Sequence, residues 1–374
     1  MPAESDTATG TAATAPDSTD STVGYTLRRV GVIMNPDPTN PDEVAGVLNP
    51  ATGRDPHGDL YLLPRLVAGG NVSRVGLARV LVTDGVPTGV QRLGVVLAPD
   101  AGWERARTHA GVEDPRVTWI PALSLHVMTY VAYGPLGPRS AVAISDDLRT
   151  WKRLGPIHFD YQEELDADLN LFCNKDMVFF GQPVPGPDGR PCFAALHRPM
   201  WDLDLVAPGL GVYLPAGVSD DRPGIWISYV PVDEATRDLS RLTQLSGHRQ
   251  VALPVHDFEA LKIGAGPPPL RIPQGWLLIH HGVSGVLLPG VDHQPLVQYA
   301  VGAMILSADD PAVVVARTSA PLLTAQTDQE RTGIVPNVVF PTAIENIDGQ
   351  LFVFYGMADS RIGVAALDRT QVPS

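Results

Sequence analysis

One aspartate in the sequence is placed where a carboxyl group could transfer a proton. Asp114 stands in the segment GVEDPRVTWI, directly before Pro115. A proline disfavours the helical region for the residue before it, so Asp114 is expected to be extended at the start of a strand. A carboxyl group held there could act as a general acid, although an isolated aspartate of this kind more often caps a turn. Because neighbours on a strand face opposite sides, Glu113 is expected to be structural.

Four basic residues, far apart in the chain, could together bind an anion: Arg139, Lys175, Lys262 and His281. Lys175 and Lys262 lie in FCNKDMVFF and LKIGAGPPPL, among apolar residues and glycines that suit positions lining a channel. Arginine and lysine bind phosphate through charge-assisted hydrogen bonds. His280 precedes His281, so at most one of the two is expected to face the channel. Taken singly, each basic residue would more often be a solvated surface charge, and their joint meaning depends on the fold.

The elements that would position these residues recur five times. Each repeat has a polar-headed segment, then an apolar or aromatic strand, then an alternating strand that ends in a polar turn. The aromatic strands are predicted at 60–66, 126–134, 191–199, 275–283 and 351–359, and the polar heads contain Asn49, Asp114, Lys175, Lys262 and Asn337. Repeats of this kind, each forming one small sheet, are typical of radial architectures, and the alternative is a solenoid, whose repeats are usually shorter. We therefore predict an all-β fold, a five-bladed β-propeller whose polar heads converge on one site.

The chain divides into a short tail and one folded unit. Residues 1–23 are mostly Ala, Thr, Ser, Asp and Gly, which predicts a disordered N-terminal tail. Residues 24–374 are predicted to form a single propeller, the catalytic domain, in which folded sequence starts near Tyr25. Residues 231–258, the longest stretch between recognised motifs, should form part of an outer strand and a rim, with one helix near 233–242.

Composition excludes several classes of function. The formal net charge of -14 argues against nucleic acid and anionic membrane surfaces as partners. Cys173 and Cys192 are too few for a disulfide framework. No metal-ligand spacing occurs, so neither a metal nor another cofactor is expected. The chain has no long apolar run and no segment that reads as a secretion signal, which predicts a cytoplasmic protein. Whether rim loops form a homo-oligomer interface stays open.

Several segments together resemble glycoside hydrolase family 130, the β-mannoside phosphorylases and β-mannosidases. They are GVEDPRVT, NKDMVFF, HRP, KIGAGPPPL, GWLLIHHGV and NVVFP with YGMADSRIGVA, and the resemblance runs from about Val44 to Asp368. It implies a five-bladed β-propeller with an inverting mechanism. Asp114 matches the family's catalytic acid, which protonates the glycosidic oxygen through the 3-hydroxyl of the sugar. Inorganic phosphate, the co-substrate, then attacks the anomeric carbon and gives α-mannose 1-phosphate.

The resemblance also assigns binding roles. It implies phosphate binding by Arg139, Lys175, Lys262 and His281, and sugar binding by Asn49, Arg65, Arg198, Asn337 and Asp359. Hydrolytic members lose the basic set, so its retention favours a phosphorylase acting on a small carbohydrate. The alternatives are a β-mannosidase on the same fold and a propeller that only binds partners. Neither the linkage nor the acceptor sugar is indicated.

Overall fold

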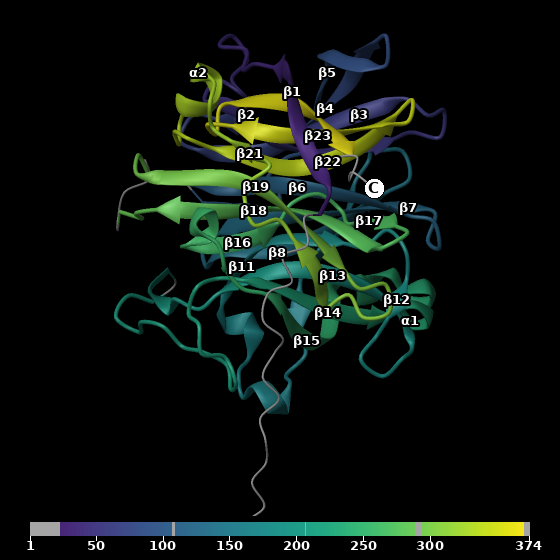
Figure 1. Cartoon of the computed structure of the whole chain (residues 1–374), viewed down its shortest axis with the longest axis vertical. Helices are drawn as coiled ribbons and strands as arrows, with labels where there is room; N and C mark the ends of the chain where they lie inside the picture. Colours follow the sequence, from purple (N-terminus) through teal and green to yellow (C-terminus); the bar gives the residue numbers. More distant parts are fainter. Residues whose placement is uncertain (1–22, 107–108, 206, 289–293, 370–374) are drawn as a thin grey trace, which may run out of the picture.

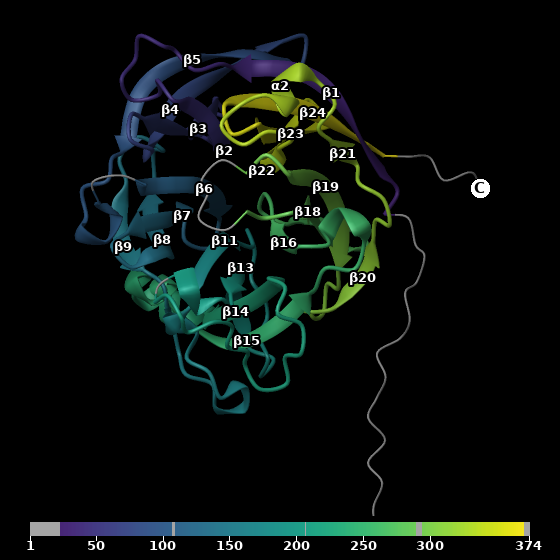
Figure 2. The same ribbon diagram turned by 90° about the vertical axis from the view of Figure 1, so that its left-hand side faces the viewer.

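The structure is a computed structural model that describes residues 23–106, 109–205, 207–288 and 294–369. Its strands form the five blades of a β-propeller, arranged around a central axis (Figures 1 and 2). The predicted all-β fold and the five-bladed arrangement are thus confirmed. Within the described residues, no helix combines the length and the apolar composition needed to span a bilayer.

Each blade is a four-stranded antiparallel sheet whose strands follow one another from the central axis outward. Blade I consists of β2 (Gly46–Arg54), β3 (Leu60–Ala68), β4 (Val72–Thr83) and β5 (Val86–Leu97). Blade II consists of β6 (Ala110–Ile120), β7 (Leu125–Gly134), β8 (Gly137–Ser145) and β9 (Lys152–Pro156). Two parallel residue pairs between β4 and β6 join these blades into one hydrogen-bonded sheet.

Blades III and IV each carry two additional short strands. Blade III consists of β11 (Cys173–Phe179), β13 (Pro191–Met200), β14 (Ile225–Pro231) and β15 (Gln244–Ala252), with β10 (His158–Phe159) beside β15 and β12 (Val184–Pro185) beside β13. Blade IV consists of β16 (Lys262–Ala265), β18 (Gly275–Gly285), β19 (Val297–Leu306) and β20 (Val314–Arg317), with β17 (Leu270–Ile272) beside β18 and β21 (Leu323–Thr324) beside β19.

Blade V is completed by the first strand of the chain. It consists of β22 (Val339–Ile347), β23 (Gln350–Met357), β24 (Arg361–Arg369) and β1 (Tyr25–Met34). β1 pairs antiparallel with β24 from Tyr25 opposite Arg369 to Met34 opposite Ile362. This pairing joins the two ends of the folded chain and closes the ring (Figure 2). Residues 1–22 of the predicted tail lie outside the described residues, and Val23 is already buried.

Helical segments are short and lie between strands. The α-helices are α1 (Val232–Arg237) and α2 (Asp328–Arg331), and the 3-10 helices are η1 (Gly102–Glu104), η2 (Glu163–Leu165), η3 (Leu169–Leu171), η4 (Leu203–Leu205), η5 (Leu239–Thr243) and η6 (Asp257–Glu259). The single helix predicted near 233–242 is confirmed only in part, because α1 ends at Arg237, Asp238 is extended, and η5 follows as a separate 3-10 helix. The long stretch that contains them continues into β15, the outer strand of blade III, as predicted.

The hydrophobic core lies between the blades. Within the described residues it forms five clusters, and each joins neighbouring blades around the ring. Between blades II and III, for example, Val127 and Val142 pack with Phe193 and Trp226. Side chains alternate between the two faces of a strand, so a strand with a blade on either side buries both sets of residues. This explains why the aromatic strands read as nearly continuous apolar runs.

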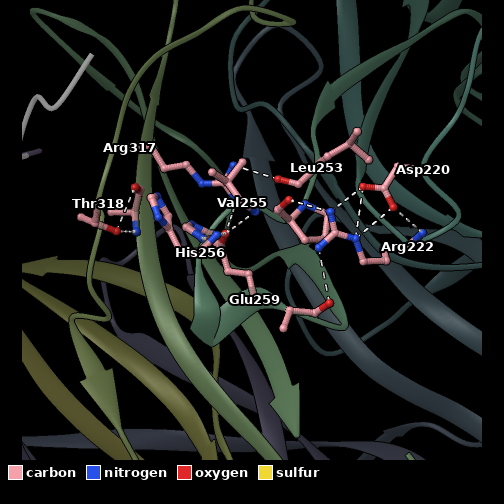
Figure 3. Close-up of polar contacts among 12 residues, drawn as sticks. Asp220, Arg222, Leu253, Val255, His256, Glu259, Arg317 and Thr318 are labelled. Carbon is pink, nitrogen blue, oxygen red and sulfur yellow. Dashed lines mark hydrogen bonds and ion pairs between the residues drawn. The ribbon is translucent and has the colours of Figure 1, made fainter. Parts of the chain in front are cut away.

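A buried glutamate ahead of the innermost strand recurs in four blades: Glu43, Glu104, Glu259 and Glu330. Each side chain accepts a hydrogen bond from an arginine of the outer strand, namely Arg92, Arg153, Arg317 and Arg29. Figure 3 shows the blade IV example, in which Glu259 also accepts the backbone N–H groups of Val255 and His256. Blade III instead has a buried chain of hydrogen bonds in which Ser228 of β14 contacts His197 of β13 and His248 of β15.

Candidate active site

Three innermost strands contain a β-bulge at their polar head. The strand register shifts beside Asn49 in β2, Asp114 in β6 and Asp176 in β11, and these residues have φ of 41°, 48° and 56°. A bulge inserts one extra residue, bends the strand and redirects side chains. The prediction that Asp114 is extended at a strand start is therefore wrong. Asp114 lies within β6 in the left-handed region, because the bulge outweighs the preference for extended backbone before Pro115.

Asp114 and Glu113 share one arginine. Arg65 of β3 donates from one terminal nitrogen to Asp114 Oδ1 at 3.1 Å and from the other to Glu113 Oε1 at 2.7 Å. Asn49 donates to the same Asp114 oxygen at 2.8 Å, and Lys175 Nζ lies 3.7 Å from Glu113 Oε2. Glu113 is therefore part of this site. The expectation that Glu113 and Asp114 face opposite sides is wrong, because the bulge cancels the alternation of side chains.

The electrostatic surroundings keep Asp114 ionised in the ligand-free site. Burial by itself would raise the pKa of its carboxyl group. The charges of Arg65, Lys175 and Arg116, together with the Asn49 hydrogen bond, outweigh burial and hold the pKa below its ordinary value. Asp114 can therefore serve as a proton donor only if substrate binding reduces this positive field.

A second buried cluster surrounds Asp176. Arg198 of β13 donates from Nε to Asp176 Oδ2 at 2.5 Å, and His281 Nε2 of β18 lies 3.5 Å from the same oxygen. Burial would raise the pKa of Asp176, but Arg198, His281 and Arg116 lower it well below its usual range. Gly264 of β16 makes room for this pair, since a Cβ there would lie 2.1 Å from Asp176 Oδ2.

His281 differs from its predicted role as a cation. Its side chain is fully buried, and burial, despite Asp176, lowers its pKa to about 3, helped by the charges of Arg198, Arg116 and Lys262. The imidazole is therefore neutral near pH 7. His280 faces the other way and bonds Glu259 at 2.8 Å, which confirms that only one of the two histidines reaches the centre.

Lys175 and Lys262 supply positive charge between the two clusters. Each ammonium group lies over a tyrosine ring, Lys175 at 5.7 Å from the Tyr133 centroid and Lys262 at 5.8 Å from that of Tyr299. Burial lowers the pKa of Lys262 to about 7, and the charges of Arg198 and Lys175 contribute. A bound anion would restore the charge of Lys262, because an opposite charge favours the protonated amine.

The turn between β23 and β24 brings in Asp359. Burial raises its pKa to about 7 against the effect of Arg65, and the negative charges of Asp114 and Glu113 raise it further. Near neutral pH this carboxyl group is therefore close to half protonated. Asn337, just before β22, has φ of 60° and its carbonyl accepts the Tyr299 N–H at 3.0 Å.

Arg139, which is predicted to bind phosphate, makes its hydrogen bonds outside the clusters around Asp114 and Asp176. It lies on β8, and within the described residues its guanidinium donates to the backbone carbonyls of Asn170 and Phe172. Its charge reaches the Cys173 thiol, as does that of Lys175. The structure therefore places Arg139 at the border of blades II and III, beside the site rather than in its hydrogen-bond network.

Arg116 forms the floor of the site. Its fully buried side chain leaves β6, donates from Nε to the Gly266 carbonyl of blade IV at 2.9 Å and packs 5.3 Å from the Phe340 ring centroid. Blades II and IV are separated by blade III, so this bond crosses the axis of the propeller. A terminal nitrogen of the same guanidinium donates to the Asp114 carbonyl at 3.1 Å.

Arg116 and Asp176 were not among the residues predicted from the sequence. The signal for Asp176 was present, because the heads LNP, EDP and KDM align Asn49, Asp114 and Asp176 at one position of the repeat. Lys175, the residue predicted from this head, stands one position before the aligned one. Within the described ranges, no group of three or more His, Cys, Asp or Glu residues is placed to hold a metal ion.

Comparison with known proteins gives a consistent result. The profile of glycoside hydrolase family 130, described as beta-1,4-mannooligosaccharide phosphorylase, matches residues 26–180 and 245–372. A beta-1,2-mannobiose phosphorylase of Thermoanaerobacter sp. strain X514 is 30% identical over 265 residues, which cover 70% of this chain and 68% of that protein. A 1,2-beta-oligomannan phosphorylase of the same organism is 27% identical over 351 residues, covering 91% and 96%.

A solved structure shows the same fold. The beta-1,2-mannobiose phosphorylase from Listeria innocua, in complex with beta-1,2-mannobiose, superimposes with a TM-score of 0.61 at 20% identity. The match covers 95% of this chain and 93% of that one. At this level of identity the likeness supports the propeller fold and carries no information on the substrate.

Proposed function

The chain belongs to glycoside hydrolase family 130, and from this premise we infer that it is an inverting β-mannoside phosphorylase. It cleaves small β-mannosides with inorganic phosphate and releases α-mannose 1-phosphate. The observation that carries this proposal is the position of Asp114, which lies beside two partly buried cations, Arg65 and Lys175. An anionic nucleophile needs such cations, and it needs no second carboxylate to activate it.

Asp114 is proposed as the proton donor. As in the family, it protonates the glycosidic oxygen through the 3-hydroxyl group of the mannosyl unit. Phosphate bound near Lys175 would offset part of the positive field that lowers the Asp114 pKa, and so would raise that pKa towards the value an acid requires. The bond from phosphate oxygen to the anomeric carbon forms as the glycosidic bond breaks. The proton lost by hydrogen phosphate then restores the Asp114 carboxyl group.

Binding roles are proposed for the other predicted residues. Lys175, Lys262, His281 and Arg139 would form the phosphate side of the site, with Lys262 recharged by the bound anion and His281 acting as a neutral group behind Asp176. Asn49, Arg65, Arg198, Asn337 and Asp359 would contact the sugar. Asn49 and Arg65 already bond Asp114, which supports their place next to the sugar's reacting end. The reaction as proposed uses no cofactor.

One observation favours a second candidate, a β-mannosidase. Asp359 has a pKa raised to about 7, and such a carboxylate could act as a general base that activates water. Glu113 is less suited to this task, because Arg65 and Lys175 already engage both of its oxygens. The two candidates differ in their need for phosphate.

The deciding experiment measures the reaction in both directions, synthesis from α-mannose 1-phosphate and cleavage of mannobiose. The purified protein is incubated with α-mannose 1-phosphate and a panel of acceptors (mannose, glucose, N-acetylglucosamine), and separately with β-1,2- and β-1,4-mannobiose with and without phosphate. A phosphorylase releases phosphate with its preferred acceptor and cleaves its mannobiose only when phosphate is present. Release of mannose in phosphate-free buffer would instead establish the hydrolase.

Variants connect the activity to the site. Asp114→Asn should lower turnover by about 10³-fold, as expected for loss of a general acid. Asp59→Asn is the matched control, because Asp59 pairs with Arg79 on the surface at 2.8 Å. If Asp114→Asn and Asp59→Asn were equally active, Asp114 would not be the acid.

A further inference from the structure

The propeller has a cavity at the end of its axis away from the candidate active site. Its volume is about 530 Å³, and its lining includes residues 52–56, 117–119, 268–270 and 344–345 together with Gly181. These segments lie near the ends of the five innermost strands or just beyond them. The polar heads with Asn49 and Asp114 precede them on the same strands, so the cavity opens at the end opposite the candidate active site.

Arg116 separates this cavity from the candidate active site. Its guanidinium crosses the axis to the Gly266 carbonyl and is fully buried, one residue before the cavity-lining segment of β6 begins. A ligand in the far cavity would therefore not touch Asp114. The volume lies within the range of about 300–1,000 Å³ that is usual for small-molecule sites.

An exposed tryptophan forms one wall of the cavity. The Trp119 side chain is 46% exposed, although tryptophan is normally well buried in such a fold. Its indole packs against the imidazole of His126, the residue opposite it on β7, with ring centroids 4.7 Å apart. The Trp119 ring is therefore held in place while presenting apolar surface to the cavity.

Polar groups surround the indole. His126 is only 3% exposed, and its Nδ1 makes no hydrogen bond within the described residues, although the carbonyls of Arg54 and Ser145 are near enough to affect its pKa. Burial lowers that pKa, so the ring is neutral near pH 7. Glu345 lies across the cavity with an oxygen 3.5 Å from Arg54 Nε. The cavity thus offers a guanidinium and a carboxyl group beside an aromatic wall, and the buried His126 imidazole supports that wall from behind.

We propose that this cavity is a second saccharide-binding site, which takes one glycosyl ring stacked on Trp119. A pyranose has an apolar C–H face that suits an indole, and its rim of hydroxyl groups can both donate and accept hydrogen bonds. Those hydroxyl groups match a donor and an acceptor of the cavity lining, the Arg54 guanidinium and the Glu345 carboxyl group. The site lies outside the proposed catalytic function and does not depend on it.

An organic cation is the other ligand that an exposed indole attracts, and the hydrogen bonds of the lining carboxylates bear on it. Glu345 is partnered by Arg54, and burial raises its pKa. Asp55 accepts the N–H groups of His57 and Asp59 and the hydroxyl of Tyr61. Two of the three carboxylates that line the cavity are therefore already engaged, and the third, Asp146, is exposed to solvent.

The test observes Trp119 directly. The full chain carrying Asp114→Asn, which removes turnover, is labelled with 5-fluorotryptophan, and the Trp119 resonance is assigned by its loss in Trp119→Phe. We expect the ¹⁹F resonance of Trp119 to shift saturably with β-1,2- or β-1,4-mannobiose, while that of Trp103, also exposed, stays unchanged. Glu345→Gln should weaken the titration by roughly three- to tenfold, and Trp119→Ala in the active protein should leave phosphate-dependent turnover unchanged.

Three results would overturn the proposal. The first is no Trp119 shift at tens of millimolar sugar. The second is a shift with tetramethylammonium and none with either mannobiose, which would make this a cation site. The third is a Trp119 titration whose midpoint equals the active-site affinity and which Glu345→Gln does not alter, because Trp119 would then report the catalytic site. If the parent chain showed no phosphorylase activity but the Trp119 resonance still shifted saturably, the second saccharide site would be supported. Only the proposed catalytic function would then be contradicted.

Discussion

Glu113 and Asp114 are neighbours in sequence, and their carboxylates contact the two ends of a single guanidinium, that of Arg65, at 2.7 and 3.1 Å. A regular strand would send these side chains to opposite faces. The bulge in β6 brings them to the same side and places a second negative charge next to Asp114. Glu113 thus fixes the arginine that Asp114 also uses, and it holds Lys175 at 3.7 Å.

Replacing Glu113 by glutamine should impair the site without unfolding the protein. The change removes the charge that holds Arg65 and Lys175, and charged hydrogen bonds of this kind contribute about 1.5–3 kcal/mol. We expect kcat/KM for phosphorolysis to fall at least about tenfold, with a thermal midpoint close to that of the parent. Glu164→Gln, at an exposed position, is the control. Activity equal to that control would mean that Glu113 does not position the cations.

Much of the fold follows from the sequence because each repeat carries its own signals. Blades bury both faces of their inner strands, and this produces the apolar runs at 126–134 and 275–283 that are readable without a structure. The closure of blade V is harder to predict from the sequence. The sequence marks Tyr25 as the start of the folded part. Its partner strand β24 lies at the other end of the chain, and no local sequence pattern encodes the pairing of the two strands.

The site was predicted less completely, for two physical reasons. A bulge depends on pairing with the neighbouring strand, so the left-handed backbone of Asp114 and the new direction of Glu113 cannot be read from residue types. The ionisation state depends on burial and on the sum of nearby charges. His281 therefore appears as a cation in the sequence, whereas burial makes it neutral in the structure.

Gly264 gives a test of the packing around Asp176. An added Cβ would lie 2.1 Å from Asp176 Oδ2 and 2.5 Å from His281 Cε1, so one of these side chains would have to move. We expect Gly264→Ala to lower turnover at least tenfold, an effect of displacing positioned groups by about 1 Å. Gly69→Ala is the control, since a Cβ there meets nothing within 4 Å. Equal activity of the two variants would show that the Asp176 cluster tolerates displacement.

The recurring buried glutamate should contribute to stability rather than to catalysis. In Glu259→Gln, an amide NH₂ would replace an oxygen in a pocket where His280, Arg317 and two backbone N–H groups all donate (Figure 3). Breaking a buried ion pair costs about 3–5 kcal/mol. Chemical denaturation should show a loss of this order, whereas Glu234→Gln, which breaks the partly exposed pair with Arg241, should cost about 1 kcal/mol or less. Similar losses in both variants would contradict a special role for Glu259.

Asp359 should make the stability of the protein depend on pH. Its folded-state pKa is raised from 3.8 to about 7, so between these values the folded state binds more protons than the unfolded state. Its contribution to stability is therefore fully present below pH 3.8 and is lost as the pH rises through about 7. Asp359→Asn has no carboxyl group to ionise and should lack this loss. The opposite effect of His281, whose pKa is lowered from 6.5 to about 3, is common to both proteins and cancels in their difference. Lys262 does not interfere, because its effect begins near pH 7 and extends upward.

The measurement compares the urea-induced unfolding of the parent and of Asp359→Asn at intervals from pH 4 to pH 7. Between the two limits, the difference in unfolding free energy should change by at least about 1 kcal/mol in favour of the variant, the equivalent of a one-unit pKa shift being 1.36 kcal/mol. Asp59→Asn, at a surface carboxylate, provides the baseline for an ordinary aspartate. If Asp359→Asn followed the Asp59→Asn curve, the Asp359 carboxyl group would be ionised throughout and could not exchange a proton near neutral pH. Its candidate role as a base in hydrolysis would then be lost as well.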